Sequence, residues 1–87
     1  MYTAHAIARC QQRSIPADAV DALLAYGERK RHQGADVYYL TKSSRSRVER
    51  ALGAGYRRME RALDAYVVVS DDGTIITAAR RLQRLKF

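Results

Sequence analysis

Three side chains near the start of the sequence are spaced so that they could act together on a phosphodiester. His5, Arg9 and Arg13 recur at intervals of four residues, which places them in a line along one face of a helix. An imidazole can accept or donate a proton near neutral pH. Guanidinium groups can neutralise the charge that develops on phosphorus when RNA is cleaved without a metal. The same spacing also fits the solvated face of an amphipathic helix, so both interpretations remain open.

A second set of candidates lies in the basic run that ends at His32. Alternation along an edge strand would send Lys30 and His32 to one face, and Arg29 and Arg31 to the other. His32 is the other of the two histidines, and so it is the remaining imidazole that could serve as acid or base. Charges on an edge strand also prevent strand-to-strand aggregation, which is the alternative explanation for this run.

The end of the sequence supplies a third set, in which arginines follow the last expected strand and could hold phosphate beside the first helix. A basic terminus that only improves solubility is the alternative. We therefore assign His5, Arg9, His32 and Arg80 as candidate catalytic residues, and Arg13, Lys30, Thr77, Arg81 and Arg84 as candidate nucleic-acid contacts. Tyr38, Tyr39 and Tyr66 could stack on bases, although most of the seven aromatic residues are expected in the core.

The composition points to a phosphate-bearing partner. The 87 residues include 16 Lys and Arg against 9 Asp and Glu, which gives a net charge of +7, and 13 of the basic residues are arginine. Arginine binds phosphate through a planar fork and stacks on bases, so we expect nucleic acid as the partner, with RNA favoured over DNA. One cysteine and two histidines offer no metal cage, and we expect no cofactor. The apolar run 65–69 is too short to cross a bilayer, which favours a cytoplasmic protein without a membrane partner.

Two helices are expected before the first strand. Thr3 is a suitable N-cap for the first helix, whose apolar side would carry Ile7 and Cys10. Pro16 would open the second helix and Gly27 would end it.

The rest of the chain predicts two hairpins with a helix between them. The first hairpin would pair 28–33 with 36–42 around Gly34-Ala35, and the second would turn at Asp71-Asp72-Gly73. Ser43 and Ser44 would cap the intervening helix, which should kink or break near Gly53 and Gly55. Its apolar positions recur at helical spacing: Val48, Leu52, Tyr56, Met59 and Leu63. We predict a single α+β domain over 1–87, with the order ααββαββ and the helices packed on one face of an antiparallel four-stranded sheet.

Two stretches of the sequence resemble a small bacterial family, domain of unknown function 4258. They are the run from His5 to Pro16, with its His…Arg…Arg spacing, and the hairpin from Ala65 to Thr77. The resemblance covers nearly the whole chain. It implies a fold like that of the RelE and BrnT toxins, which are compact ribonucleases with terminal helices packed on an antiparallel sheet. On that likeness His5, Arg9, Thr77 and Arg80 would line the cleft.

The sequence departs from the pattern of this family at two places. Relatives usually have glycine where Ser14 stands, and often have His and Tyr where this chain has Arg80 and Leu82. If cleavage depends on that pair, this chain would bind RNA without cutting it.

Three functions are therefore carried forward. The first is a toxin-like, metal-independent endoribonuclease with a small acidic antitoxin as partner. The second is a non-catalytic module that binds nucleic acid through the same arginines. The third is an accessory domain whose basic face meets an acidic protein. The site prediction requires that the polar face of the first helix lie beside the last strand.

Overall fold

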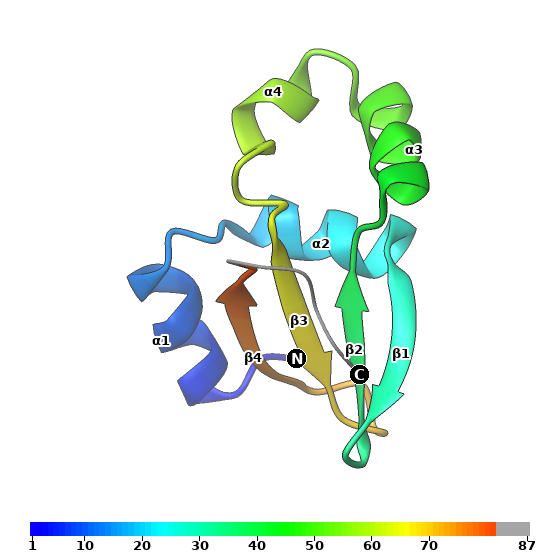
Figure 1. The fold of residues 1–87 in the computed structure, drawn as a ribbon. Helices are drawn as coiled ribbons and strands as arrows, with labels where there is room; N and C mark the ends of the chain where they lie inside the picture. Colours follow the sequence, from blue (N-terminus) through cyan, green and yellow to red (C-terminus); the bar gives the residue numbers. More distant parts are fainter. Residues whose placement is uncertain (82–87) are drawn as a thin grey trace.

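Four antiparallel strands form one sheet in the order β1-β2-β3-β4, so each strand pairs with its neighbour in the chain. In the computed structural model, which describes residues 1–81, the strands are β1 (Glu28–His32), β2 (Ala35–Tyr39), β3 (Ala65–Val69) and β4 (Ile75–Arg80). The helices are α1 (Ala4–Gln12), α2 (Ala17–Tyr26), α3 (Lys42–Leu52) and α4 (Gly55–Met59). The predicted α+β class and four-stranded antiparallel sheet are confirmed (Figure 1).

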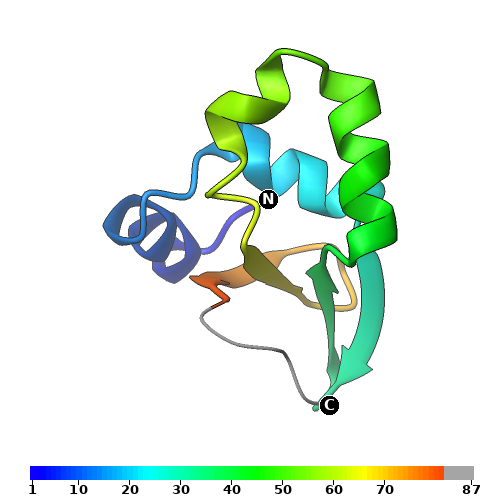
Figure 2. The same ribbon diagram turned by 45° about the horizontal axis from the view of Figure 1, so that its top comes forward.

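The helical region between the two hairpins consists of two helices rather than one. Gly53 ends α3 with a positive φ of 56°, and α4 begins at Gly55. The break predicted at these glycines is therefore confirmed, because a left-handed φ is inaccessible to a continuing helix. Both helices lie beyond one end of β2 and β3 (Figures 1 and 2). None of the helices within residues 1–81 has the length and apolar character needed to cross a membrane.

The cap of α3 differs from the prediction. Thr41, not Ser43 or Ser44, is the N-cap. Its hydroxyl accepts a hydrogen bond from the Ser44 backbone N–H at 3.2 Å, and the Ser44 hydroxyl accepts one from the Thr41 N–H at 2.7 Å. This reciprocal pair is a capping box, which satisfies two backbone donors at once and lets Ser44 be fully buried.

The first hairpin turns one residue earlier than predicted. Its two turn residues are Gln33 and Gly34, with φ values of 50° and 81°, and His32 pairs with Ala35. Two positive φ values match the right-handed twist of the flanking strands. The second strand ends at Tyr39 rather than at residue 42, because the cap of α3 follows at once.

The second hairpin forms at the predicted turn, where Gly73 adopts a φ of 86°. The Asp72 carboxylate accepts hydrogen bonds from the Ser70 hydroxyl and from the Thr74 backbone N–H. These bonds stabilise the charged form and lower the pKa of Asp72 to about 2.

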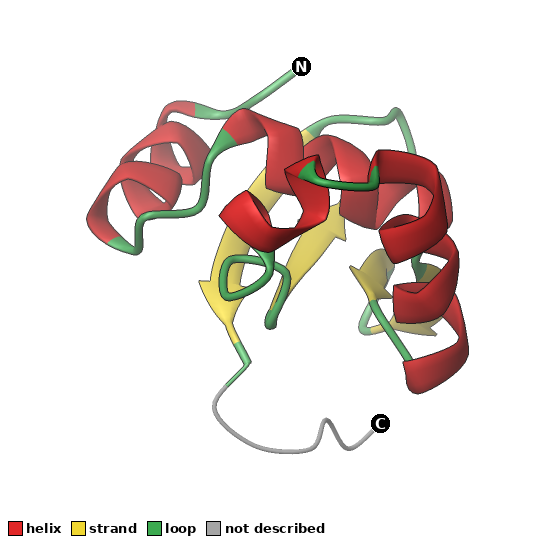
Figure 3. Ribbon diagram, turned by 90° about the horizontal axis from the view of Figure 1, so that it is seen from above, coloured by secondary structure: helices red, strands yellow, loops and turns green. Residues whose placement is uncertain are grey.

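One face of the sheet is covered by helices. No helix of residues 1–81 covers the other face, which is called the open face below, although Val37 on that face is buried. Along β3, Ala65, Val67 and Val69 are buried, whereas Tyr66 and Val68 alternate to the other side and are half-buried. The buried set packs with Val20 and Leu23 of α2 in one core. Figure 3 shows most of the helical turns on one side of the strands, and in Figure 1 no helix of residues 1–81 lies in front of them.

The start of the chain closes the outer edge of β4. Thr3 donates its backbone N–H to the Ile75 carbonyl at 3.0 Å, and Ile75 donates to the Met1 carbonyl at 2.7 Å. The Thr3 hydroxyl donates to the Ile76 carbonyl at 3.1 Å and also accepts from the Ala6 N–H at 3.0 Å. Thr3 is therefore the predicted N-cap of α1, and it fixes the start of that helix beside β4.

The buried side of α1 is centred on Ala6 and not on Ile7. Ala6 is fully buried, Cys10 is partly buried, and Ile7 is 48% exposed. The prediction that Ile7 faces the core is wrong, because the preceding residue, Ala6, is the one that packs into it. Gly27 is the predicted C-cap of α2. Its φ is −73°, so glycine is needed there for space: a Cβ would lie 2.4 Å from the Leu23 carbonyl oxygen.

The backbone at Ser14 generates a testable prediction. Ser14 is exposed and holds a φ of 52° directly after α1, a region in which a side chain costs about 1–2 kcal/mol. We expect Ser14→Gly to raise the free energy of unfolding by about 1 kcal/mol, measured by urea denaturation. Ser46→Gly, at an exposed position inside α3, is the matched control and should lower it by about 0.5 kcal/mol. A loss of stability in Ser14→Gly would contradict the argument.

Candidate nucleic-acid interface

The first helix and the last strand lie side by side, as the site prediction requires. Thr3 contacts the Ile76 carbonyl at one end, and at the other end Arg80 Nε donates to the Arg13 carbonyl at 3.0 Å. From Thr3 to Arg13 a helix rises about 15 Å, and from Ile76 to Arg80 a strand rises about 13 Å. The two contacts therefore hold α1 roughly parallel to β4 along its length.

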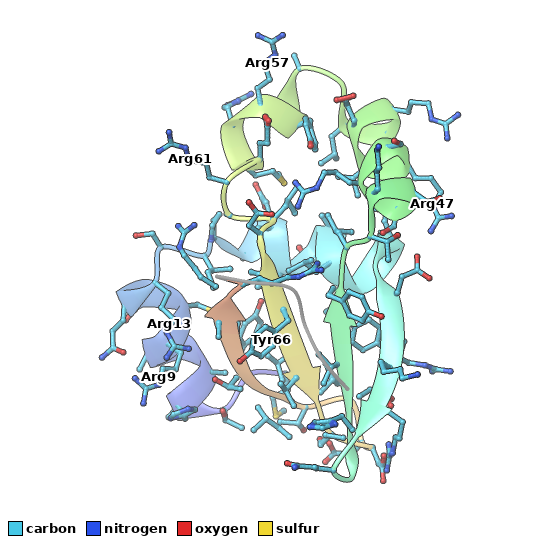
Figure 4. The ribbon with its side chains drawn as sticks, in the orientation of Figure 1. Arg9, Arg13, Arg47, Arg57, Arg61 and Tyr66 are labelled. Carbon is cyan, nitrogen blue, oxygen red and sulfur yellow. The ribbon has the colours of Figure 1, made fainter. Side chains whose placement is uncertain are left out.

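The His5 and Arg9 flank of α1 lies on the side of the open sheet face. Ile7 and Cys10 turn toward the start of α2, where they line a pocket with Pro16 and Ala17. At 100° per residue, His5 and Arg9 are on the opposite flank of the helix. Since α2 covers the other face of the sheet, this flank borders the open face. Figure 4 shows Arg9 and Arg13 along α1 beside β4.

His5 and Arg9 contact each other at the surface. Arg9 Nε donates to His5 Nε2 at 3.4 Å, and Arg9 Nη1 donates to Gln12 Oε1 at 3.0 Å. His5 Nε2 is the acceptor in the first of these contacts. Within residues 1–81, neither side chain forms an ion pair with a carboxylate. The positive charge of Arg9 is thus available to an anion from solution.

Arg80 is committed to the backbone. Besides the Arg13 carbonyl, its guanidinium donates to the Arg61 carbonyl at 3.2 Å and to the Ser14 carbonyl at 3.4 Å. These bonds use three of its five N–H donors. Arg80 pairs with the buried Ala65, so it lies toward the helix-covered face. The structure thus gives Arg80 a bracing role, and its assignment as a catalytic residue stays a prediction.

Arg13 makes the reciprocal contact. Its Nη1 donates to the Ala78 carbonyl on β4 at 2.9 Å, while its own carbonyl accepts from Arg80. Within residues 1–81 neither guanidinium forms an ion pair with a carboxylate, so both add positive potential at the end of α1.

The structure does not bring the two histidines together. His32 and Lys30 are exposed on β1, which forms the opposite edge of the sheet from β4. Three strand spacings separate these edges by about 14 Å. One phosphodiester cannot reach both imidazoles across that width, so His5 and His32 cannot act as a base and acid pair on it. Next to His32, Arg31 binds Asp71 and Asp36, and its hydrogen bond lowers the pKa of Asp71.

The remaining predicted contacts lie on or beyond the open face. Thr77 is half-buried there, opposite Val68. Arg81 Nη1 donates to the Leu40 carbonyl at 2.6 Å, and its guanidinium carbon lies 5.4 Å from the centroid of the Tyr39 ring. Arg81 is therefore held against the sheet. Arg84 falls outside the described residues.

A group of cationic side chains lies on α4 and directly after it. Arg57, Arg58 and Arg61 are exposed and form no ion pair within the described part of the chain. Figure 4 shows Arg57 and Arg61 projecting outward, with Arg61 above the end of α1. By contrast, Arg45 binds Asp64 at 2.7 Å and Arg47 binds Glu28 at 3.4 Å. No spacing in the sequence distinguishes the paired arginines from the unpaired ones, because their partners lie 19 residues away.

The other flank of α1 borders an apolar pocket of about 550 Å³. No basic side chain lines it, so it is unsuited to phosphate. Burial raises the pKa of the Cys10 thiol, which keeps it protonated and makes it a weak nucleophile. Within residues 1–81 there is no cluster of three His, Cys, Asp or Glu side chains that could hold a metal ion.

The bracing role of Arg80 can be measured. We expect Arg80→Ala to lower the free energy of unfolding by about 1–2 kcal/mol, because three backbone carbonyls lose a charged donor. Arg57→Ala removes the same charge from an exposed position and should change it by less than about 0.5 kcal/mol. Urea denaturation followed by circular dichroism compares the two. Equal stabilities would show that Arg80 does not brace α1.

Comparison with known proteins places the chain in a family. No curated protein and no solved structure matches it. A family model described as a domain of unknown function (DUF4258) matches residues 2–80, a range that includes every helix and strand of residues 1–81. The chain therefore belongs to the DUF4258 family, as its two characteristic stretches predicted.

Proposed function

We propose that the protein binds RNA and that the row His5-Arg9-Arg13 beside β4 receives the phosphate backbone. The observation that carries this proposal is the unneutralised positive charge of Arg9. Its charge is not neutralised by any carboxylate of residues 1–81, and it lies next to an imidazole on the flank that borders the open sheet face. A guanidinium in that setting binds phosphate oxygens strongly and with defined geometry.

The charge distribution of the whole chain supports the same conclusion. Only Arg31, Arg45 and Arg47 form ion pairs within the described residues. Most of the 13 arginines therefore form no ion pair within these residues, and Arg61, just after α4, adds a cation above the end of α1. Release of counterions from the nucleic acid would then drive association.

A second candidate function, metal-independent cleavage of RNA, rests on the contact between His5 and Arg9. In this reaction His5 Nε2 accepts the proton of a 2′-hydroxyl, and the 2′-oxygen forms a bond to phosphorus as the bond to the 5′-oxygen breaks. Water donates a proton to the leaving oxygen, and Arg9 neutralises the phosphoryl oxygens. When Arg9 turns to the phosphate, it releases the lone pair of His5 Nε2, which accepts from Arg9 Nε in the free protein.

An acidic partner fits either candidate. If the protein cleaves RNA as a toxin, with a fold of the RelE type, a small acidic antitoxin that covers Arg9 and Arg13 would block it. If it does not bind RNA, the same cations would serve an accessory domain that meets an acidic protein.

Salt dependence tests the RNA-binding proposal. The affinity for a short single-stranded RNA would be measured between about 50 and 200 mM salt, and its logarithm should fall linearly with log salt. Arg9→Ala should reduce that slope by about 0.7, the contribution of one phosphate contact to a single strand. Arg47→Ala is the matched control, since it removes one charge that Glu28 already neutralises on the far side of the molecule. If both variants change the slope equally, the row on α1 is not the phosphate site.

Cleavage is tested separately on the same RNA in the presence of EDTA. We expect products that end in a 2′,3′-cyclic phosphate, and no product from an RNA with a 2′-deoxy sugar at the cleavage site. His5→Ala should abolish the reaction. His32→Ala is the matched comparison and should retain it, because β1 lies at the opposite edge of the sheet. If the protein binds the RNA but the RNA stays intact, the binding function stands and the proposed cleavage is excluded.

A further inference from the structure

An aromatic residue lies on the open face of the sheet, close to the row on α1. Tyr66 belongs to β3 and alternates away from the buried Ala65 and Val67. It pairs with Tyr39 on β2 and with Ala79 on β4. Figure 4 shows Tyr66 over the sheet. Arg9 and Arg13 lie beside the sheet, on the side of β4. The half-buried ring does not belong to the core that α2 covers.

The two neighbours of Tyr66 leave different amounts of room. On one side, Tyr39 already carries the Arg81 guanidinium on its ring. On the other side, Ala79 presents only a methyl group. Within residues 1–81 the Tyr66 hydroxyl makes no hydrogen bond, whereas the Tyr56 hydroxyl accepts one from Arg45. Among residues 1–81, the position beside Tyr66 on the β4 side therefore carries only a methyl group.

A nucleotide would span the distance between this surface and the cations. Adjacent strands are about 4.8 Å apart, so Tyr66 lies one strand spacing inside β4, and α1 lies just outside it. A phosphate bound at Arg9 and Arg13 places its base over β4, at the edge of the Tyr66 ring. Thr77, also on this face of β4, adds a hydroxyl that can meet the edge of the base.

We propose that Tyr66 is a base-stacking site and that the ligand is single-stranded RNA with an unpaired base. The inference rests on the proposed RNA-binding function and adds to it a preference for single strands. Duplex RNA hides its bases within the helical stack, whereas unpaired bases can turn out and lie on an aromatic ring. The apolar patch alone would be unspecific, but its position beside unneutralised arginines selects a ligand that carries both phosphate and an aromatic face.

The test compares three variants with the intact chain. Tyr66→Leu removes the ring and Tyr66→Phe keeps it. Tyr38→Leu removes a tyrosine from the covered face of the adjacent strand, where it packs against the core, and serves as the matched control. Thermal unfolding by circular dichroism confirms that each is folded. Affinities are measured for a single-stranded RNA and for a duplex of the same sequence, and a 2-aminopurine base in the single strand reports stacking through quenching of its fluorescence.

Stacking predicts that Tyr66→Leu weakens single-strand binding by about five- to a hundredfold. Duplex affinity should stay unchanged, and quenching of 2-aminopurine should disappear. Tyr66→Phe and Tyr38→Leu should retain both affinity and quenching. If Tyr66→Leu binds and quenches as the intact chain does, the stacking site is wrong although RNA binding stands. If the intact chain binds neither RNA, both this inference and the proposed function fail.

Discussion

The Arg80 guanidinium holds together three backbone segments on which the candidate site depends. It donates to the carbonyls of Arg13 and Ser14, at the end of α1, and to that of Arg61, after α4. Carbonyls at the end of a helix carry partial negative charge, so a cation is favourably placed there. Arg13 reaches back to β4 in turn. Without these bonds the helix that carries His5 and Arg9 would be held to the sheet by its first residues and by the packing of Ala6 and Cys10 alone.

The arginines fall into groups according to the partners that their guanidinium groups bind. Some neutralise carboxylates on distant elements, as Arg45 does with Asp64 and Arg47 with Glu28. Arg13 and Arg80 bind uncharged carbonyls, so they hold the backbone and still keep their positive charge at the end of α1. A net charge counts all of these equally. The proposed phosphate site lies where a structural arginine, Arg13, is next to Arg9, whose charge no carboxylate of residues 1–81 neutralises. The net charge alone does not show this.

The sequence predicted the features that local physics determines. Thr3, Gly27 and the Asp72-Gly73 turn were identified because each satisfies a backbone requirement within a few residues. The helix periodicity of α1 correctly placed His5 and Arg9 on one flank. The periodicity did not predict that Ala6 rather than Ile7 is buried, because this depends on how α1 lies against β4.

The other features that the sequence did not predict have the same origin. Several hydroxyls could have capped α3, and the reciprocal bonds of Thr41 and Ser44 decided between them. The two histidines could be paired in a hypothetical reaction until the strand order placed β1 and β4 at opposite edges. Likewise, the partners of Arg80 are carbonyls, which carry no sequence signature. What the sequence lacked in each case was the relative position of elements distant along the chain.

The pairing of the first residues with β4 also governs when the site can exist. Thr3 and Ile76 are 73 residues apart in sequence, so α1 has no partner while the intervening strands are being synthesised. Contacts of such separation form late, because a long loop must close before they contribute stability. During translation, β4 would have to emerge from the ribosome before α1, with His5 and Arg9, could pack beside it. Any affinity for RNA that depends on this site would then be absent from the nascent chain and would appear only in the finished fold.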